Sequence, residues 1–279
     1  MGYKSLLTVM TETKTAQAAL AQLAALAEAQ DAHAEALCLG VDRSQTGYYY
    51  AGANALILQE TLSRANAEAD EVLNFAKDFL GKTGIRWSAE NGVAQIADIG
   101  RHVAHRARFS DLVVLPHPYG EDRGAEAEPI IEAAMFEGHA PVLVVPNDAE
   151  PFSVPRKVMI AWNESVEAMR AIRRALPFLK HADLAHIVVI DPPRHGPDRS
   201  DPGGLLSQML ARHGVKCEIE VLSKTMTRVS DILNRHALDT ESDLIIMGAY
   251  GHSRFREAIL GGATRNMLEQ SVVPVFLAH

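Results

Sequence analysis

Residues 242–279 read SDLIIMGAYGHSRFREAILGGATRNMLEQSVVPVFLAH, and the interpretation of the whole chain rests on this stretch. An apolar run at residues 244–247 predicts a buried strand, and residues 263–270 predict a helix. Four glycines lie between them, at Gly248, Gly251, Gly261 and Gly262. Glycine lets backbone N–H groups approach an anion closely, and a helix N-terminus attracts negative charge. The stretch is therefore a candidate phosphate-binding loop, although glycines that only form turns would give the same pattern.

The chain contains an internal repeat. Three segments of the first half recur in the same order in the second half, which predicts a tandem duplication. The matched pairs are residues 4–11 with 157–164, residues 110–120 (SDLVVLPHPYG) with 242–251 (SDLIIMGAYG), and residues 140–145 (APVLVV) with 273–278 (VPVFLA). We expect a first domain at residues 1–146, a proline-containing linker at 147–156 and a second domain at 157–279.

Both halves alternate short Val/Ile/Leu-rich runs with helical segments. This alternation predicts α/β architecture, with two doubly wound, five-stranded parallel sheets covered by helices on both faces. In the first half we expect a helix capped by Thr13, a strand at residues 85–89 and a helix at 93–106. In such folds ligands bind at the carboxyl ends of the strands, where the strand order reverses. The glycine-rich stretch follows one of these ends.

The composition of the chain argues against several classes of function. The chain has 279 residues and a formal net charge of -8, which argues against a nucleic-acid-binding surface. No apolar run reaches the roughly 18 residues of a membrane-spanning helix, and the first residues lack the apolar core of a signal peptide. The two cysteines, Cys38 and Cys217, form no metal or redox motif. We therefore expect a cytoplasmic protein that binds neither nucleic acid nor membrane.

The spacing Gly248-x2-Gly251-x9-Gly261, followed by a short helix and Val-Pro-Val-Phe-Leu, resembles the universal stress protein family. The resemblance covers essentially the whole chain in its tandem form. It implies the family's fold, related to the adenine-nucleotide alpha-hydrolases, in each half. It also implies a stress-responsive sensor or regulator that binds ATP, with or without Mg²⁺, or a related adenine nucleotide. Family members pair through their last strands, so the resemblance predicts that residues 142–145 and 275–277 pair within the chain. A homodimer is a further possibility.

The resemblance also assigns residues to the nucleotide site of the second half. An acidic residue after the first strand meets the nucleoside, the end of the second strand packs on adenine, and the glycine loop surrounds the phosphates. His252, inside the loop, would supply a further phosphate donor. These positions fall on Asn163, Val189, Ile190, Met247, Gly248, Gly251, His252, Gly261, Gly262 and Ala263. The chain departs from the family pattern at Asn163, which replaces the acid, and at Gly262, which replaces Ser or Thr.

The first half lacks the features that the resemblance assigns to the nucleotide site. Met10 stands at the acidic position, and Pro116 replaces the first glycine, so a backbone donor is lost. Residues 121–128 (EDRGAEAE) carry four acids and one arginine, which would repel phosphate. We therefore expect a degenerate site in the first half.

No set of residues indicates catalysis. The sequence has no P-loop and no nucleophile elbow, so we expect no enzyme, although slow ATP hydrolysis stays open. His102, His105 and His117 lie near one another in sequence, but no neighbouring ligand completes a known zinc spacing, so we expect no metal site. The competing hypothesis is a protein-interaction module that binds no nucleotide because both sites have lapsed.

Overall fold

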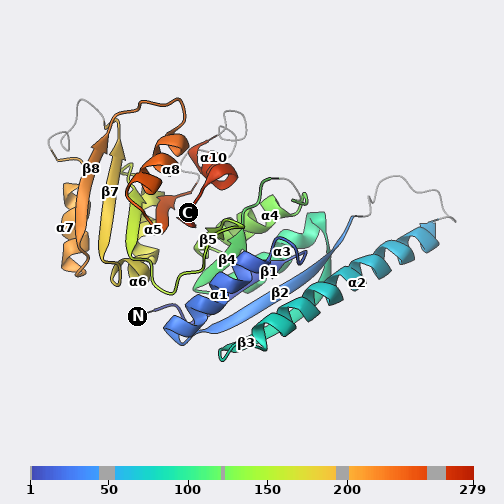
Figure 1. Cartoon of the computed structure of the whole chain (residues 1–279). Helices are drawn as coiled ribbons and strands as arrows, with labels where there is room; N and C mark the ends of the chain where they lie inside the picture. The colour runs from blue at the N-terminus through green and yellow to red at the C-terminus, as the bar shows by residue number, and fades with distance from the viewer. Residues whose placement is uncertain (1, 44–53, 121–122, 193–200, 250–261) are drawn as a thin grey trace. The chain divides into compact units, whose positions relative to one another are not determined.

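A computed structural model of the chain describes residues 2–43, 54–120, 123–192, 201–249 and 262–279 (Figure 1). Its contacts divide the chain into two units. One unit comprises residues 3–140, and the other comprises residues 141–279 with the N-terminal end. The boundary lies ahead of the linker that the sequence predicts at residues 147–156.

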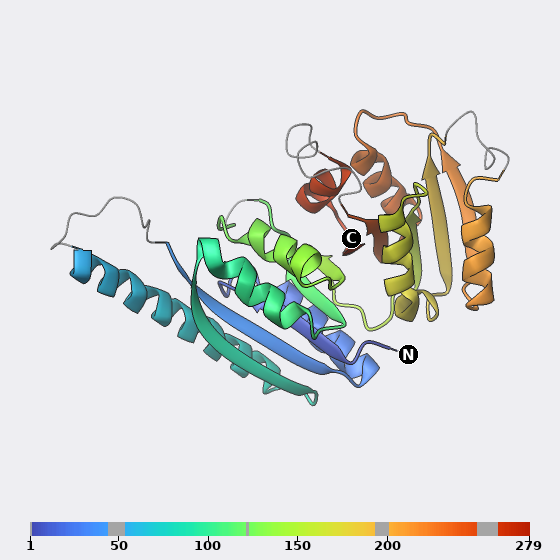
Figure 2. The ribbon, with the colours of Figure 1, turned by 180° about the vertical axis from the view of Figure 1, so that it is seen from behind.

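The first unit contains four parallel strands in the order β3-β2-β1-β4. They are β1 (Ser5–Met10), β2 (His33–Asp42), β3 (Arg86–Gln95) and β4 (Leu112–Pro116). The helices are α1 (Gln17–Gln30), α2 (Asn54–Leu80), α3 (Ile96–Ala107), α4 (Ala127–Glu132) and the π-helical turn η1 (Ala133–Glu137). Figure 2, seen from behind, places α3 and α4 on the face opposite to α1 and α2. The apolar side chains of β1 and β4 are buried between these layers, as the continuous apolar runs predict.

The second unit contains six strands in the order β5-β10-β9-β6-β7-β8. They are β5 (Val142–Val145), β6 (Lys157–Ala161), β7 (Leu184–Ile190), β8 (Cys217–Leu222), β9 (Leu244–Gly248) and β10 (Val275–Ala278). The helices are α5 (Val166–Arg174), α6 (Leu176–Leu179), α7 (Gly204–Arg212), α8 (Val229–Asp239) and α10 (Ala263–Gln270). All neighbours with a described register run parallel except β5, which pairs antiparallel with β10 through Val144 and Val275.

The α/β class and the order of strands and helices are as the sequence predicts. The final strands of the two repeats pair with each other, also as expected, and this antiparallel pair makes the sheet mixed rather than wholly parallel. Phe276 of β10 is fully buried and packs edge-on against Phe178, with ring centroids 6.0 Å apart. The pairing therefore contributes to the core of the second unit.

Two local predictions for the first unit are wrong. Strand β3 continues to Gln95, so the helix expected at residues 93–106 begins only at Ile96. The reason is the length of β2, which offers hydrogen-bonding partners along all ten residues of β3. Thr13 does not cap α1 either: this helix begins at Gln17 with Ala16 at the N-cap position and no side-chain cap. Residues 14–16 form a turn in which the Thr15 hydroxyl donates to Glu12.

Candidate functional site

The expected site residues of the second unit lie at the carboxyl end of its sheet. In the register, Ala161 of β6 is the partner of Val188 on β7 and of Met247 on β9. Val189, Ile190 and Gly248 follow this level on the flanking strands, and Asn163 lies two residues beyond Ala161. Strand order reverses at β6, because β7 and β8 extend to one side while β9 and β10 lie on the other. The fold thus brings these residues to the place where ligands of doubly wound sheets bind.

Asn163 begins the turn that leads from β6 into α5. Its Oδ1 accepts a hydrogen bond from the amide of Ser165 at 3.2 Å. Ser165 in turn caps α5, because its hydroxyl accepts from the amide of Ala168 at 3.1 Å. The Asn163 side chain is exposed, and its Nδ2 has no partner within the described part of the chain. The turn therefore fixes the acceptor and leaves two N–H donors for a ligand.

Gly248 has a packing role that the sequence did not reveal. A Cβ atom at this position would lie 2.4 Å from the amide nitrogen of Ala168 and 2.6 Å from the carbonyl carbon of Glu167. The first turn of α5 can therefore approach the end of β9 only because residue 248 has no side chain. Val189 and Met247 are buried, with 5% and 6% of their surface exposed, and Ile190 is half-buried. These three apolar side chains contribute no hydrogen-bonding group.

The N-terminus of α10 has an exposed first residue and no side-chain cap. Gly262 is at the N-cap position in extended conformation, and the first turn contains no acidic residue. Ala263, the first helical residue, is exposed. A helix N-terminus attracts anions, and no acidic side chain of the first turn opposes one here. Gly251, His252 and Gly261 of the expected site lie outside the described residues.

A pocket of about 440 Å³ opens beside Asn163, between the β6–α5 turn and the start of α7. Its apolar walls are Trp162, Val166, Met169, Leu205 and Leu206, and its polar groups come from Glu164, Ser165 and Asp201. Gly203, with φ 91°, completes the wall, and a Cβ there would lie 3.3 Å from Ile187 Cγ2. Sequence reasoning missed this pocket. The available signal was Trp162, an aromatic residue that directly follows the first strand of the repeat.

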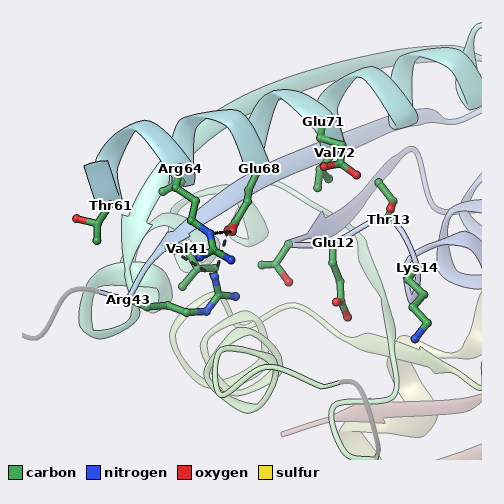
Figure 3. Close-up of a pocket in the computed structure, with 12 residues that line it drawn as sticks. Glu12, Thr13, Lys14, Val41, Arg43, Thr61, Arg64, Glu68, Glu71 and Val72 are labelled. Atoms are coloured by element: carbon green, nitrogen blue, oxygen red, sulfur yellow. Dashed lines mark hydrogen bonds and ion pairs between the residues drawn. The ribbon is translucent and has the colours of Figure 1, made fainter. Parts of the chain in front are cut away.

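The first unit has a larger pocket at the corresponding place, between the ends of β1 and β2 and helix α2 (Figure 3). Its volume is about 560 Å³. Its charged side chains are Glu12, Lys14, Arg43, Arg64, Glu68 and Glu71. Arg43 and Arg64 both approach Glu68, each at 3.1 Å, so much of the charge is neutralised inside the pocket. The two repeats therefore present opposite chemistry at equivalent positions, polar in the first and largely apolar in the second.

The crevice between β1 and β4 of the first unit is nearly filled. It holds only about 30 Å³, and Met10 and Pro116 are among its walls. This volume is far below the roughly 300 Å³ at which small-molecule pockets begin. His117 follows Pro116, and burial, aided by the charge of Arg123, lowers the pKa of His117 to about 4. His102 and His105 are exposed on α3.

Within the described ranges, no helix is both long and apolar enough to cross a membrane.

Comparison with known proteins relates the second half of the chain to a protein family. Residues 155–279 match the model of the universal stress protein family. Universal stress protein Slr1230 from Synechocystis sp. (strain ATCC 27184 / PCC 6803 / Kazusa) is 29% identical over 153 residues, which are 54% of this chain. The alignment spans 50% of the length of that relative.

Solved structures extend the likeness in fold to the whole chain. A universal stress protein from Archaeoglobus fulgidus DSM 4304 superposes with a TM-score of 0.74 at 15% identity, over 98% of this chain and 96% of that one. A functionally unknown protein from Pseudomonas aeruginosa PAO1 gives a TM-score of 0.57 at 14% identity, over 99% and 92%. The sequence of residues 155–279 matches the universal stress protein family, and the full chain shares the fold of a solved universal stress protein.

Proposed function

We propose that the second unit binds ATP or a related adenine nucleotide at the carboxyl ends of β6, β7 and β9. The protein would then act as a stress-responsive sensor or regulator rather than as an enzyme. The observation that carries the proposal is the register that aligns Ala161, Val188 and Met247 around the strand where the order reverses. This arrangement lies in the unit that carries the family match.

The nucleoside would bind beside Asn163. Its exposed Nδ2 would donate to the ribose or the base, while its Oδ1 stays engaged with the Ser165 amide. The neighbouring pocket offers Trp162 and Met169 as apolar walls, and its volume of about 440 Å³ is within the range of small-molecule sites. An aromatic wall suits a purine, because flat rings stack with offset geometry.

The phosphates would bind at the start of α10. Ala263 is exposed there, Gly262 provides no side-chain cap, and a helix N-terminus carries partial positive charge. Gly251, His252 and Gly261 of the preceding stretch would complete the cradle, and Mg²⁺ would arrive with the nucleotide. In the first unit, the filled crevice beside Met10 favours a different role from nucleotide binding.

A second candidate function is a protein-interaction module. Val166 and Leu205, which line the pocket, are 61% and 74% exposed. Exposed apolar side chains around a pocket are typical of surfaces that bind an apolar partner. In this case the pocket would accept a side chain of another protein, and nucleotide would not compete for it.

The test is calorimetric titration of ATP with Mg²⁺ into the wild type and two variants of Gly262. Gly262→Asp provides a good N-cap but places a negative charge at the phosphate position. Gly262→Asn is the matched control, because it caps equally well and is neutral. We expect the Asp variant to bind ATP at least about tenfold more weakly than the Asn variant, a difference of about 1.4 kcal/mol.

Two outcomes would contradict the proposal. If wild-type protein binds no ATP at millimolar concentration and retains no nucleotide on purification, the second unit is not a nucleotide site. If ATP binds but the Asp and Asn variants bind equally, the phosphates do not lie at α10.

A further inference from the structure

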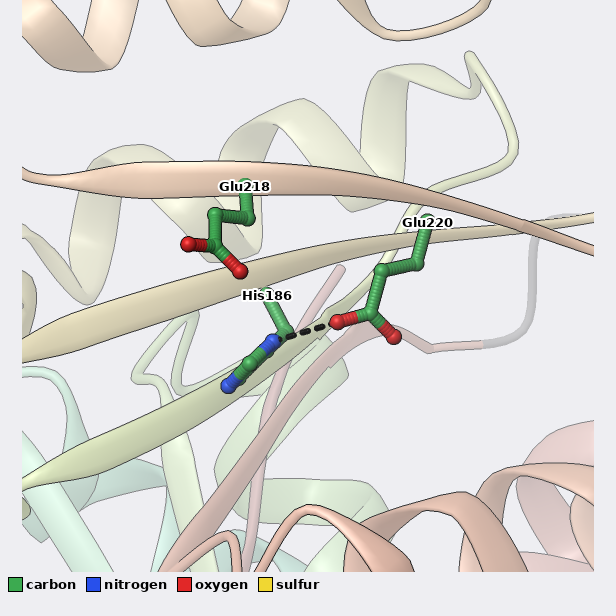
Figure 4. Close-up of side chains that lie close together, drawn as sticks. All are labelled: His186, Glu218 and Glu220. Atoms are coloured by element: carbon green, nitrogen blue, oxygen red, sulfur yellow. Dashed lines mark hydrogen bonds and ion pairs between the residues drawn. The ribbon is translucent and has the colours of Figure 1, made fainter.

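Three side chains of the second unit gather on one face of its sheet, below the carboxyl ends of the strands (Figure 4). His186 lies on β7 and is the register partner of Glu218 on β8. Glu220 follows two residues later on β8, so it projects from the same face as Glu218. One nitrogen of His186 and one oxygen of each carboxylate all lie within 4.8 Å of one another.

A second imidazole reaches the group from α8. Glu220 Oε1 lies 2.6 Å from His186 Nδ1, and Glu220 Oε2 contacts His236 Nε2. Only 7% of the surface of His186 is exposed, whereas Glu218 is exposed. The cluster is therefore buried on the side of β7 and open to solvent at the edge of β8.

The cluster lacks a balancing cation from the protein. Among the described residues, no lysine or arginine pairs with Glu218 or Glu220, and the ion pairs of Glu220 are with the two histidines. Two neighbouring carboxylates repel each other, and the partial burial of Glu220 increases the cost of its charge. A bound divalent cation would offset both effects.

We propose that His186, Glu218, Glu220 and His236 form a binding site for a divalent transition metal, with Zn²⁺ as the expected ion. Two imidazole nitrogens and two carboxylate oxygens make a four-ligand set typical of tetrahedral zinc. Mg²⁺ and Ca²⁺ prefer oxygen ligands alone, so the two imidazoles disfavour them. Ligand atoms around tetrahedral Zn²⁺ lie roughly 3.4 Å apart. Atoms of His186, Glu218 and Glu220 lie within 4.8 Å of one another, and His236 would join them from its contact with Glu220.

The metal would connect three elements of the second unit. It would join the edge strand β8 to β7 and to α8, and so stabilise a strand that has a neighbour on one side only. Each imidazole would have to present an unprotonated nitrogen to the metal. Binding should therefore weaken as the pH falls.

The experiment uses the full chain without a histidine tag. Protein is treated with EDTA, loaded with Zn²⁺, dialysed and analysed for metal by mass spectrometry, and Co²⁺ is titrated with visible absorption as a probe of tetrahedral geometry. We expect one Zn²⁺ per chain, a melting temperature that Zn²⁺ raises and EDTA lowers, and the absorption bands of tetrahedral Co²⁺.

The variants are Glu220→Gln and His236→Gln, and the matched control is His213→Gln, which removes an exposed histidine at the end of α7. Loss of an outer-shell partner costs about 10–100-fold in metal affinity, so loss of a ligand should cost at least about 100-fold. The control should bind like the wild type. His236→Gln is included because its side chain lies on α8 rather than in the sheet. A loss of metal binding in this variant can therefore be separated from a disturbed sheet.

The proposal is overturned if the loaded wild type holds no metal above background. It is also overturned if the two ligand variants bind Zn²⁺ as tightly as the His213→Gln control. In either case the cluster is a hydrogen-bonded His–Glu–His chain that needs no ion. Because the readout involves no nucleotide, these outcomes do not depend on the function proposed above.

Discussion

Gly248 at the end of β9 lies against Ala168 in the first turn of α5, so that an added Cβ would be 2.4 Å from the Ala168 amide nitrogen. This contact packs the first turn of α5 directly against the end of β9. The glycine is therefore required by the packing of the unit, whether or not a ligand binds.

Gly248→Ala should destabilise the second unit by about 1–3 kcal/mol, because α5 must move to admit the methyl group. The control is Gly92→Ala on β3, where a Cβ would lie 3.6 Å from Leu39 Cδ2 in ordinary contact; its unfolding is followed by Trp87 of the same unit, with Trp162 replaced by Phe. Urea unfolding followed by Trp162 fluorescence, with Trp87 replaced by Phe, reports on the second unit alone. Equal midpoints for wild type and Gly248→Ala would show that the close approach is not present in solution.

Asn163→Asp should strengthen ATP binding if the nucleoside lies beside this turn. One carboxylate oxygen still accepts from the Ser165 amide, and the other replaces the Nδ2 donor by an acceptor for a ribose hydroxyl. A hydrogen bond to a charged group is stronger than one between neutral groups by about 1 kcal/mol. We expect about a fivefold gain in affinity by calorimetry. The gain should vanish with 2′,3′-dideoxy-ATP, and a gain that persists would place Asn163 away from the ribose.

His117 should make the first unit sensitive to acid. Its pKa is lowered from 6.5 to about 4, so between these values the unfolded chain binds a proton that the folded chain does not. Stability is therefore full above pH 6.5 and falls as the pH decreases toward 4, by up to about 3 kcal/mol.

His117→Gln should remove this part of the pH dependence of unfolding. His102→Gln, an exposed histidine of the same unit, should leave the dependence unchanged. Parallel pH profiles for the wild type and the His117 variant would argue that His117 is protonated in the folded protein.

The two free cysteines should differ in reactivity. Cys38 is buried, and burial raises the pKa of its thiol to about 12, only partly opposed by Lys77. Cys217 is half-buried beside Ser207. A thiol-disulfide reagent at pH 8 should modify one thiol per folded chain, and Cys217→Ser should abolish this reaction.

The raised pKa of Cys38 also predicts that the protein loses stability at alkaline pH. The unfolded thiol ionises near pH 9 while the folded one stays protonated to about pH 12, so stability falls as the pH rises through this interval. Rapid modification of two thiols in the folded protein would contradict the burial of Cys38.

Much of the fold follows from local patterns, because Val/Ile/Leu runs that alternate with helical segments specify parallel strands and their crossovers. The error at β3 arose from a long-range cause: its last residues are held in the ladder by residues 53 positions earlier, from Leu39 to Asp42. That the candidate residues Asn163, Val189 and Gly248 lie at neighbouring strand ends was predictable, because the carboxyl ends of parallel strands meet at one edge of the sheet. The His186 cluster was not, because Glu220 lies 34 residues from His186 and 16 from His236, and only the sheet register and α8 bring them together.

Strand β5 belongs to the first repeat by sequence but to the second unit by contacts. The repeated segment of the sequence and the compact unit of the structure therefore have different limits. A fragment cut at residue 155, where the family match begins, would leave the β5-facing side of β10 with unsatisfied amides and carbonyls. A fragment that begins at Pro141 retains β5, which pairs with β10 and satisfies these groups. We expect the shorter fragment to unfold at a lower urea concentration than the longer one, because it lacks the β5–β10 pairing, so an intact second half includes the last strand of the first.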